Sequence, residues 1–385
     1  MEKAFGILKK INENGFSAYL VGGCVRDCLM GKKPHDFDIA SNALPEDIKK
    51  IFPNTRDIGI SHGTVTVIDN EDKFEITTFR SEGEYSDGRR PNNVTFINDL
   101  NTDLSRRDFT INAMALDPSG SLMDPFNGKS HITQKIIQTV GDPDSRFSED
   151  ALRMIRAIRF SCQLGFKIES KTLKAIKTNK KKIKNVSSER ITDEIIRAVN
   201  SKFVENTNYL QSTELIKEIS RTARHFDPAI LKRIPPRYNY RLYAFINLSS
   251  IGLRSLTLSQ ANVDNYRNYF MQIENNRIFL KQMLQKFDAE FIIKVLFFRS
   301  YYEDSDYYLR ALEQVQDILK YNEPYDIKHL AVNGNDIKEM GIGNGVEIGN
   351  ILNRLLELVI IHPEKNKRDI LMEKAAEKVN SQKTI

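Results

Sequence analysis

Residues 35–40 are His35-Asp36-Phe37-Asp38-Ile39-Ala40, in which two carboxylates stand one residue apart among apolar side chains. Side chains of a β-strand alternate between its faces, so both carboxylates are predicted to leave one face while Phe37 and Ile39 enter a core. Carboxylate oxygens are hard ligands that suit Mg²⁺, which commonly takes one or two of them together with substrate phosphates. The pattern therefore predicts that Asp36 and Asp38 are catalytic and hold Mg²⁺.

A glycine pair lies shortly upstream, in Tyr19-Leu20-Val21-Gly22-Gly23-Cys24-Val25-Arg26-Asp27. We interpret this stretch as a strand, a tight turn and the start of a helix. Glycines let backbone N–H groups approach phosphate oxygens, and a helix N-terminus favours negative charge. Arg26, one turn into the helix, can add a charge-assisted contact. A bare glycine pair more often marks a structural turn, but the two aspartates that follow favour a phosphate site.

The positive charge of the chain is concentrated in one segment. The chain has 385 residues, enough for two or more domains, and its 57 Lys and Arg exceed its 51 Asp and Glu by a net +6. Between Gly165 and Asn185 a single acid, Glu169, accompanies eight lysines, which are Lys167, Lys171, Lys174, Lys177, Lys180, Lys181, Lys182 and Lys184. Such a run is either a solvated helix face or a surface for a nucleic acid backbone. Its position beside the candidate catalytic motifs favours the backbone.

The remaining composition predicts a cytoplasmic protein. The three cysteines, Cys24, Cys28 and Cys162, form neither a disulfide framework nor a zinc-ligand pattern, so we expect reduced thiols. No segment has the length and apolarity of a signal peptide or a membrane span, so no membrane contact is expected. The sequence leaves the oligomeric state open between a monomer and a homodimer.

The element pattern changes along the chain. Short β-type runs at 17–21, 36–39, 64–68 and 74–79 alternate with helical segments, whereas strands nearly vanish after Ser148. Helix starts are predicted at Ser148 and Ser187, with breaks near Pro228, Pro235-Pro236, Pro324 and Pro363. The predicted fold class is α+β, with a small mixed sheet in an N-terminal head and helices beyond it. The predicted divisions are a head at 1–140, a neck at 141–200, a body at 201–325 and a tail at 326–385.

Two further groups of polar residues are candidates for the site. In Arg106-Arg107-Asp108-Phe109-Thr110-Ile111-Asn112-Ala113-Met114-Ala115, residues Asp108 and Asn112 are four apart and would share a helix face that addresses ribose and phosphate. The alternative is a capping acid followed by a core helix. Glu75, in another β-type run, is either a third carboxylate of the site or a half-buried strand acid.

The motifs taken together resemble a known family. Five motifs occur in the order seen in class II tRNA nucleotidyltransferases. Two of them are the glycine-pair and aspartate stretches quoted above. The other three are Arg106-Arg107-Asp108-Phe109-Thr110-Ile111-Asn112-Ala113, Glu149-Asp150-Ala151-Leu152-Arg153-Met154-Ile155-Arg156-Ala157-Ile158-Arg159-Phe160 and Ser188-Glu189-Arg190. Class II tRNA nucleotidyltransferases are the CCA-adding enzymes, whose relatives include the bacterial poly(A) polymerases. The resemblance covers roughly the first 200 residues, continues weakly at 332–358, and is only helical between about 200 and 328. It implies a catalytic head at 1–140, a base-reading neck at 141–200 and a tRNA-binding tail at 326–385.

The resemblance implies that protein side chains, rather than a template, select the nucleotide. The family uses a Glu-Asp-x-x-Arg motif, here Glu149, Asp150 and Arg153. On one helix Asp150 and Arg153 would be neighbours, one an acceptor and one a donor, which complements the amine and ring nitrogen that cytosine and adenine share. Uracil and guanine present the reverse polarity, and each buried mismatch costs about 1–3 kcal/mol.

The nucleotide-binding residues implied by the resemblance are Gly23, Arg26, Arg107, Asp150, Arg153, Arg156 and Arg159. At roughly 100° per residue, Arg159 would face nearly opposite Asp150 on a helix, so these arginines cannot all contact one base. Arg156 and Arg159 are therefore predicted to serve phosphates or the contact between head and stalk. The alternative for both is an ion pair between helices.

Two segments relate to the conformational behaviour of the family. The glycine-rich segment 80–91 corresponds to a loop that helps related enzymes change from CTP to ATP, and its presence favours complete CCA addition. The family's Asp-Pro-Phe-Gly-Gly-x-x-Asp linker is here Asp124-Pro125-Phe126-Asn127-Gly128-Lys129-Ser130-His131, which keeps one glycine and lacks the final acid. The resemblance therefore predicts the active site more firmly than a hinge between head and stalk.

The sequence predicts template-independent addition of CCA to tRNA 3′ ends by two-metal nucleotidyl transfer. The expected substrates are CTP, ATP and tRNA, the expected cofactor is Mg²⁺, and the basic stalk would bind the tRNA backbone. The alternatives are a poly(A) polymerase, a tRNA nucleotidyltransferase that adds only the terminal A, and a non-catalytic RNA-binding protein. The last of these predicts lost metal ligands, whereas both Asp36 and Asp38 are present.

Overall fold

The computed structural model describes residues 1–34, 36–57, 63–69, 72–82, 94–237, 239–303, 305–342 and 344–382. The chain forms two compact units, Met1–Leu258 and Ser259–Ile385. The division into a head, neck, body and tail stays a prediction. Most of segment 80–91 lies outside the described residues, and so does the prediction attached to it.

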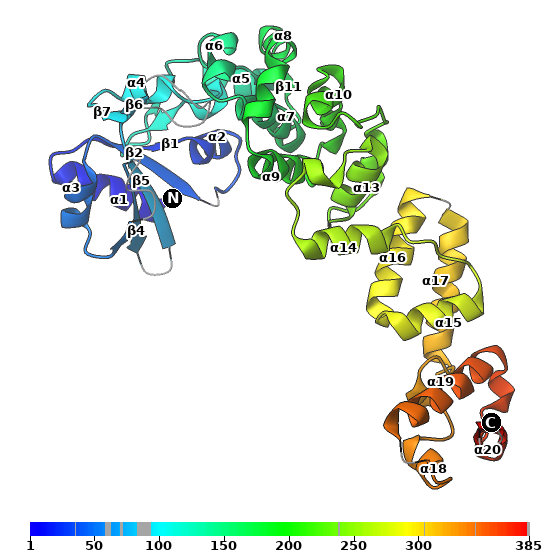
Figure 1. Ribbon diagram of the computed structural model, residues 1–385. Helices are drawn as coiled ribbons and strands as arrows, with labels where there is room; N and C mark the ends of the chain where they lie inside the picture. The colour runs from blue at the N-terminus through cyan, green and yellow to red at the C-terminus, as the bar shows by residue number, and fades with distance from the viewer. Residues whose placement is uncertain are drawn as a thin grey trace. The chain divides into compact units, whose positions relative to one another are not determined.

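A seven-stranded mixed sheet organises the start of the first unit (Figure 1). Across the sheet the strands are β3 (Thr55–Arg56), β4 (Thr64–Asp69), β5 (Asp72–Thr78), β2 (Phe37–Ser41), β1 (Ala18–Val21), β8 (Ala115–Leu116) and β9 (Leu122–Met123). Strand β2 runs parallel to β5 and antiparallel to β1. All seven strands lie within the predicted head, and the four predicted strands are confirmed with shifts of one or two residues.

Each face of this sheet packs on its own apolar cluster. Ile39 belongs to the larger cluster, which includes residues of α1 (Glu2–Glu13) and α3 (Pro45–Ile51). Ala40 belongs to the smaller one, together with Leu104 of α4 (Leu100–Ser105). Because side chains alternate along β2, Asp38 shares the α4 face with Ala40. The sheet therefore directs Asp38 to the face covered by α4.

Shorter elements complete the head. They are α2 (Gly23–Leu29), β6 (Arg80–Glu82), β7 (Val94–Phe96), η2 (Thr110–Asn112), α5 (Gly128–Gln134) and β10 (Ile136–Ile137). The prediction of one helix carrying Asp108 and Asn112 is wrong, because Phe109 is extended and forms a bridge with Thr139. Even so, the Asn112 amide donates to Asp108 at 3.4 Å.

The linker 124–131 replaces one glycine of the family pattern by a residue that can adopt the same backbone conformation. Asn127 takes the place of a glycine with φ +61°, a left-handed conformation that asparagine tolerates better than most residues. Gly128 remains necessary, because a Cβ there would lie 2.3 Å from the carbonyl oxygen of Thr110. Asp124 accepts from the backbone N–H groups of Gly128 at 2.6 Å and Lys129 at 2.9 Å.

Beyond the head, the first unit is almost entirely helical. Its elements are α6 (Pro143–Glu149), α7 (Leu152–Leu164), β11 (Lys167–Ile168), α8 (Ser170–Asn179), η3 (Lys180–Asn185), α9 (Ser188–Val199), η4 (Val204–Thr207), α10 (Asn208–Ser212), α11 (Leu215–Ile219), α12 (Ala229–Arg233), α13 (Tyr240–Ser249) and η5 (Leu253–Ser255). Helices α7 and α9 pack side by side (Figure 1). The predicted start at Ser187 is confirmed, since Ser187 is the N-cap of α9. The predicted start at Ser148 is wrong, because α6 begins earlier, at an N-cap formed by Asp142.

The second unit consists of helices. They are α14 (Gln260–Tyr269), α15 (Arg277–Lys286), α16 (Ala289–Tyr302), α17 (Ser305–Lys320), η6 (Ile327–His329), α18 (Gly334–Lys338), α19 (Gly345–Ile361), η7 (Pro363–Lys365) and α20 (Arg368–Gln382). An apolar cluster along α19 includes Ile351 and Leu355. The predicted α+β class, with a mixed N-terminal sheet followed by helices, is confirmed. In the described part of the chain, no helix combines the length and apolarity needed to cross a membrane.

Candidate active site

Three carboxylates lie together at one end of β2. Asp38 is directly opposite Glu75 in the parallel pairing of β2 with β5, and Asp36 immediately precedes β2. Burial raises the pKa of Asp38, Arg107 opposes the rise, and the charges of Glu75 and Asp36 add to it. The structure thus places both predicted catalytic aspartates and Glu75 close enough to interact, with one arginine beside them.

The carboxylates fit a divalent cation that shares its coordination with a substrate. Asp36 and Asp38 both keep surface that solvent can reach, although the Asp38 carboxyl is partly enclosed, and both supply hard oxygen donors. Within the described ranges, which omit His35, no group of three His, Cys, Asp or Glu side chains is arranged to hold a metal ion by itself. A site with few protein ligands suits Mg²⁺, which retains waters and binds substrate phosphates.

The predicted glycine turn closes against the same carboxylate. Gly22 has φ +76° and is the N-cap of α2, a backbone conformation that glycine adopts without strain. A Cβ at Gly22 would lie 3.1 Å from Nη1 of Arg107 and 3.4 Å from Oδ2 of Asp38. A side chain at this position would therefore crowd both groups. A Cβ added at Gly23, the first residue of α2, would meet the Arg26 guanidinium first.

Arg26 connects the glycine turn to the neck. Its Nη1 donates to Oδ1 of Asn112 at 2.8 Å, and its Nε and Nη2 donate to Asp27 at 2.9 and 2.8 Å. The guanidinium carbon also lies 5.5 Å from the centre of the Phe160 ring on α7. Arg26 is thus held in place on three sides.

The predicted base-reading residues lie at a break between two helices. Helix α6 ends at Glu149 and α7 begins at Leu152, whereas Asp150 between them is extended, with φ −141° and ψ +105°. Oδ1 of Asp150 accepts from the backbone N–H of Leu152 at 3.0 Å. The expectation that Asp150 and Arg153 lie on one helix is therefore wrong, because Asp150 occupies the turn before the helix of Arg153.

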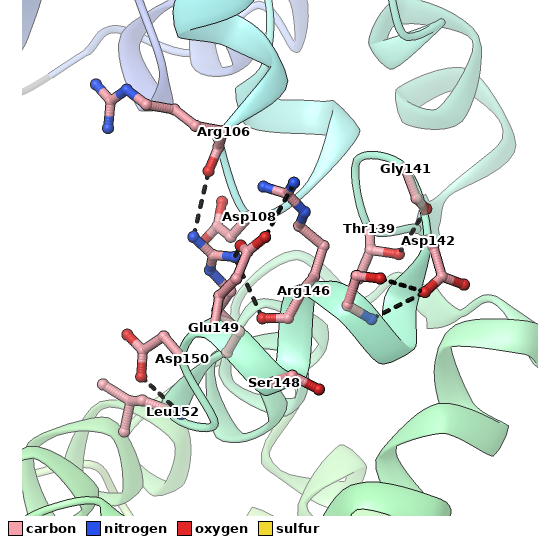
Figure 2. Close-up of polar contacts among 12 residues, drawn as sticks. Arg106, Asp108, Thr139, Gly141, Asp142, Arg146, Ser148, Glu149, Asp150 and Leu152 are labelled. Atoms are coloured by element: carbon pink, nitrogen blue, oxygen red, sulfur yellow. Dashed lines mark hydrogen bonds and ion pairs between the residues drawn. The ribbon is translucent and has the colours of Figure 1, made fainter. Parts of the chain in front are cut away.

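Arg153 is buried, and it is held by two residues of α6 and by the residue that ends α4. Its Nη1 donates to Glu149 at 2.5 Å and to the carbonyl of Arg146 at 3.2 Å, and its Nη2 donates to the carbonyl of Arg106 at 3.2 Å. Glu149 and the Arg106 carbonyl thus converge on this guanidinium. Figure 2 shows where Glu149 and Arg106 lie, with Arg146 also paired to Glu149. Glu149, the first residue of the Glu-Asp-x-x-Arg motif, thus orients Arg153, the last.

Asp150 is held by an arginine from α9. Nη2 of Arg190 donates to Oδ2 of Asp150 at 2.7 Å, and Nη1 donates to Oδ1 at 3.4 Å. The sequence placed Arg190 within a family motif but gave it no role. Asp150 and Arg190 are 40 residues apart, so no local spacing could have connected them.

Arg156 and Arg159, the last two predicted nucleotide-binding residues, form ion pairs within the protein. Nε and Nη2 of Arg156 donate to Oδ2 of Asp108 at 2.9 and 2.6 Å, which joins α7 to the head. Burial favours the neutral form of Asp108, but the paired guanidinium outweighs it and lowers the pKa of this carboxyl. Arg159 pairs with Glu194 of α9 at 2.5 Å, and both side chains are 7% exposed.

Phe160 lies at the centre of these arginines. The guanidinium carbons of Arg159 and Arg156 are 3.8 and 5.6 Å from its ring centre, and Phe109 meets it edge to face at 5.7 Å. Sequence reasoning missed the contributions of Phe160 and Glu194, whose partners come from other elements. Asp103 was also missed, although it stands three and four residues before Arg106 and Arg107, a spacing that the sequence displays.

The lysine run follows this cluster in the chain. Lys171, Lys174 and Lys177 are exposed on α8 and make no ion pair with any residue the structure describes. Lys180 pairs with Glu214, the N-cap of α11, and Lys184 pairs with Glu218 within α11. The run therefore combines exposed lysines without an acidic partner among the described residues with lysines that are held in ion pairs.

Comparisons with known proteins show which families and structures the chain is similar to. Residues 18–138 match the family described as Poly A polymerase head domain, and residues 165–221 match the one described as Probable RNA and SrmB-binding site of polymerase A. The CCA-adding enzymes of Geobacillus sp. (strain WCH70) and Lactobacillus helveticus (strain DPC 4571) are 38% and 35% identical to this chain. These alignments cover 94% of the chain and 93% of the Geobacillus protein, and 96% and 95% for the Lactobacillus protein.

A solved structure extends the likeness to the fold. The Bacillus stearothermophilus CCA-adding enzyme, solved in complex with CTP, superposes with a TM-score of 0.80 at 30% identity, covering 100% of this chain and 98% of the other. Similarity of sequence and fold thus runs through both units. The chain belongs to the family of CCA-adding enzymes and is a nucleotidyltransferase.

Proposed function

We propose that this protein adds CCA to the 3′ end of tRNA, using CTP, ATP and Mg²⁺. One link in the structure carries the proposal. Arg106 accepts from the base-reading candidate Arg153 through its carbonyl, while the next residue, Arg107, lies against Gly22 beside Asp38. A nucleotide whose base meets Arg153 would therefore have these two arginines between its base and the carboxylates that handle its phosphates.

Asp36 and Asp38 are proposed to hold Mg²⁺. When bound there, divalent ions lower the pKa of the attacking 3′-hydroxyl and neutralise charge on the α-phosphate and the leaving pyrophosphate. The turn at Gly22 and Gly23 leaves room for phosphate oxygens beside these carboxylates. Arg107 is proposed to contact a phosphate, since its Nε is buried without a hydrogen-bond partner. Arg26 shapes the phosphate side of the site from α2.

Asp150 and Arg153 are proposed to select the base. Asp150 accepts hydrogen bonds and Arg153 donates them, which matches the amine and ring nitrogen shared by cytosine and adenine. Arg190 and Glu149 fix the two side chains, so less conformational freedom is lost when a base binds. Uracil and guanine would place a carbonyl against the carboxylate.

Arg156 and Arg159 are proposed to belong to the nucleotide site through the shape they give it. Arg156 joins the neck to Asp108 of the head, and Arg159 joins α7 to Glu194 of α9. Both also pack on Phe160, so they hold the helix that presents Arg153. These contacts support the predicted link between head and stalk.

The tRNA is proposed to lie partly along the lysine run. The exposed lysines Lys171, Lys174 and Lys177 suit a phosphate backbone, and the run lies within the segment that matches an RNA-binding family. The bound CTP of the Bacillus stearothermophilus relative supports CTP as a substrate. Because tRNA is processed in the cytoplasm, we also place the protein there.

Incubation with a tRNA that lacks its CCA end tests the proposal. Labelled CTP and ATP, supplied separately and together with Mg²⁺, should extend the tRNA by two cytidines and one adenosine. An Asp36→Ala, Asp38→Ala variant is the control and should be inactive. Incorporation of ATP without CTP would instead indicate a poly(A) polymerase or an enzyme that adds only the terminal A, and activity in the variant would contradict the assigned metal ligands.

A further inference from the structure

Asp103 is a buried carboxylate to which the proposed reaction assigns no role. It lies near the end of α4, and its side chain is 1% exposed. The neighbouring Leu100 and Leu104 anchor this helix in the apolar cluster on one face of the sheet. Burying an aspartate in such a place is unfavourable unless charges and donors compensate it.

Three groups compensate Asp103. Its Oδ1 accepts from Nε and Nη2 of Arg106 at 2.9 and 2.8 Å, and from the backbone N–H of Arg80 at 3.3 Å, where β6 begins. Its Oδ2 accepts from Nη2 of Arg107 at 3.3 Å. One carboxylate therefore fixes two consecutive arginines whose charges repel each other.

The two arginines lead to different parts of the proposed site. Arg107 and Asp38 meet beside Gly22, where a Cβ would lie 3.1 Å from Nη1 of Arg107 and 3.4 Å from Oδ2 of Asp38. Arg106 uses its carbonyl to accept from Arg153. We propose that Asp103 is a positioning residue that sets Arg107 relative to the metal-binding carboxylates and sets Arg153 relative to the base. This inference rests on the proposed function, since it assigns Asp103 a part in the same reaction.

Loss of the Asp103 charge has two expected consequences. Arg107 would lose its partner while Asp38 remains beside it at Gly22, and a guanidinium closer to that carboxylate competes with a divalent cation. Arg106 would also lose its ion pair, so the carbonyl that holds Arg153 would be less well fixed. A higher Mg²⁺ requirement and weaker base selection should therefore appear together.

The alternative is that Asp103 only stabilises α4. Asp99 provides a matched control, because it caps the N-terminus of the same helix by accepting from Thr102 at 2.9 Å. Replacement of Asp99 weakens α4, whereas the ion pairs of Asp103 with Arg106 and Arg107 remain. Alanine removes the cap, whereas asparagine would keep it, so a purely structural role would give Asp99→Ala and Asp103→Asn the same profile at equal loss of thermal stability.

The test compares the full-length protein with Asp103→Asn, Asp103→Glu and Asp99→Ala. The measurements are the thermal midpoint, the CTP dissociation constant by calorimetry, the Mg²⁺ concentration for half-maximal activity, and the ratio of kcat/KM for CTP over UTP. Asp103→Asn should weaken CTP binding and lower that ratio, each by about tenfold, the size of one lost charge-assisted hydrogen bond. It should also raise the Mg²⁺ requirement severalfold, while Asp99→Ala leaves all three unchanged.

The conservative variant keeps the inference falsifiable. Asp103→Glu retains the charge on a longer side chain, so its CTP:UTP ratio should lie closer to that of the natural protein than the ratio of Asp103→Asn. Unchanged CTP affinity and ratio in Asp103→Asn, or equal changes in Asp99→Ala, would overturn the inference. If the natural protein failed to incorporate CTP, the proposed function would fail instead, and calorimetry would still report on Asp103.

Discussion

The arginines of α7 and the lysines of α8 are neighbours in the chain but differ in burial and in charge pairing. Arg153 and Arg159 are buried and held by carboxylates, so their donors are fixed in a medium of low dielectric. Lys171, Lys174 and Lys177 are exposed and make no ion pair with a described residue. The difference teaches that discriminating between bases needs donors fixed by the protein. Holding an RNA backbone of variable sequence needs only charge.

The largest loss of activity is expected on replacing the proposed metal-binding carboxylates, because neither the arginines nor the lysines can bind the metal ion in their place. Asp38→Asn should lower kcat for CTP addition by at least about 1,000-fold, because metal ions supply several kcal/mol of transition-state stabilisation. Glu75→Gln sharpens the comparison, since a third metal ligand would show a loss of similar size and a strand acid a small one. Single-turnover rates with saturating tRNA measure both. A fully active Asp38→Asn would end the metal-site assignment.

The next effect separates base selection from charge. Arg153→Lys keeps the charge but loses the planar fork of donors, so the ratio of kcat/KM for CTP over UTP should fall by about 10- to 100-fold. The tRNA dissociation constant should stay unchanged. Arg159→Lys is the matched control on the same helix, and it should lower thermal stability more than selectivity. Equal selectivity in Arg153→Lys and the natural protein would contradict the base-reading role.

How much could be predicted from the sequence depends on the distance between interacting partners. The alternation of Phe37, Asp38 and Ile39 was enough to orient β2 correctly, because a strand has a simple local period. The family motifs indicated which residues gather at the site. The break between Glu149 and Leu152 was not predicted, since it depends on Asp142 starting α6 early and on Arg190 holding the turn.

Charge pairing set a second limit. Arg156 finds Asp108 across 48 residues and Arg159 finds Glu194 across 35, so neither partner is visible in a local pattern. The helix expected for Asp108 and Asn112 failed for the same reason, because the bridge from Phe109 to Thr139 keeps that backbone extended. Asp103 was within reach, since its spacing to Arg106 and Arg107 is local.

A smaller effect on tRNA binding should follow from removing the exposed lysines of α8. Lys171→Ala, Lys174→Ala and Lys177→Ala together should weaken tRNA binding roughly tenfold at low salt, with nucleotide selectivity unchanged. Each lost phosphate contact should also reduce the slope of log K against log salt by about 0.7–0.9. The paired lysines Lys180 and Lys184 offer a control double variant with less effect on the slope. An unchanged slope in the triple variant would place the tRNA backbone elsewhere.

The smallest effect on activity is expected from breaking an ion pair of the second unit to which the proposed reaction assigns no role. Glu323 accepts from Arg277 and from Lys281, whose side chain is only 2% exposed. The hydrogen bond from Arg277 leads the causes that lower the pKa of Glu323 to about 2, with burial opposing and Lys281 contributing. This pair therefore separates charge pairing that stabilises the fold from charge pairing that orients a site.

The pH dependence of stability follows from the direction of that shift. Because the pKa of Glu323 is lower in the folded protein than in the unfolded chain, its contribution is present above about pH 4 and is lost as the pH falls toward 2. Glu323→Gln should lower the free energy of unfolding of this unit by roughly 2 kcal/mol at pH 7, because Lys281 is left buried without its acid. Urea unfolding followed by circular dichroism suits a chain without tryptophan. The natural protein and the variant should converge in stability near pH 2 while CTP binding at pH 7 stays equal, and a constant difference at every pH would assign the stabilisation to packing instead of charge.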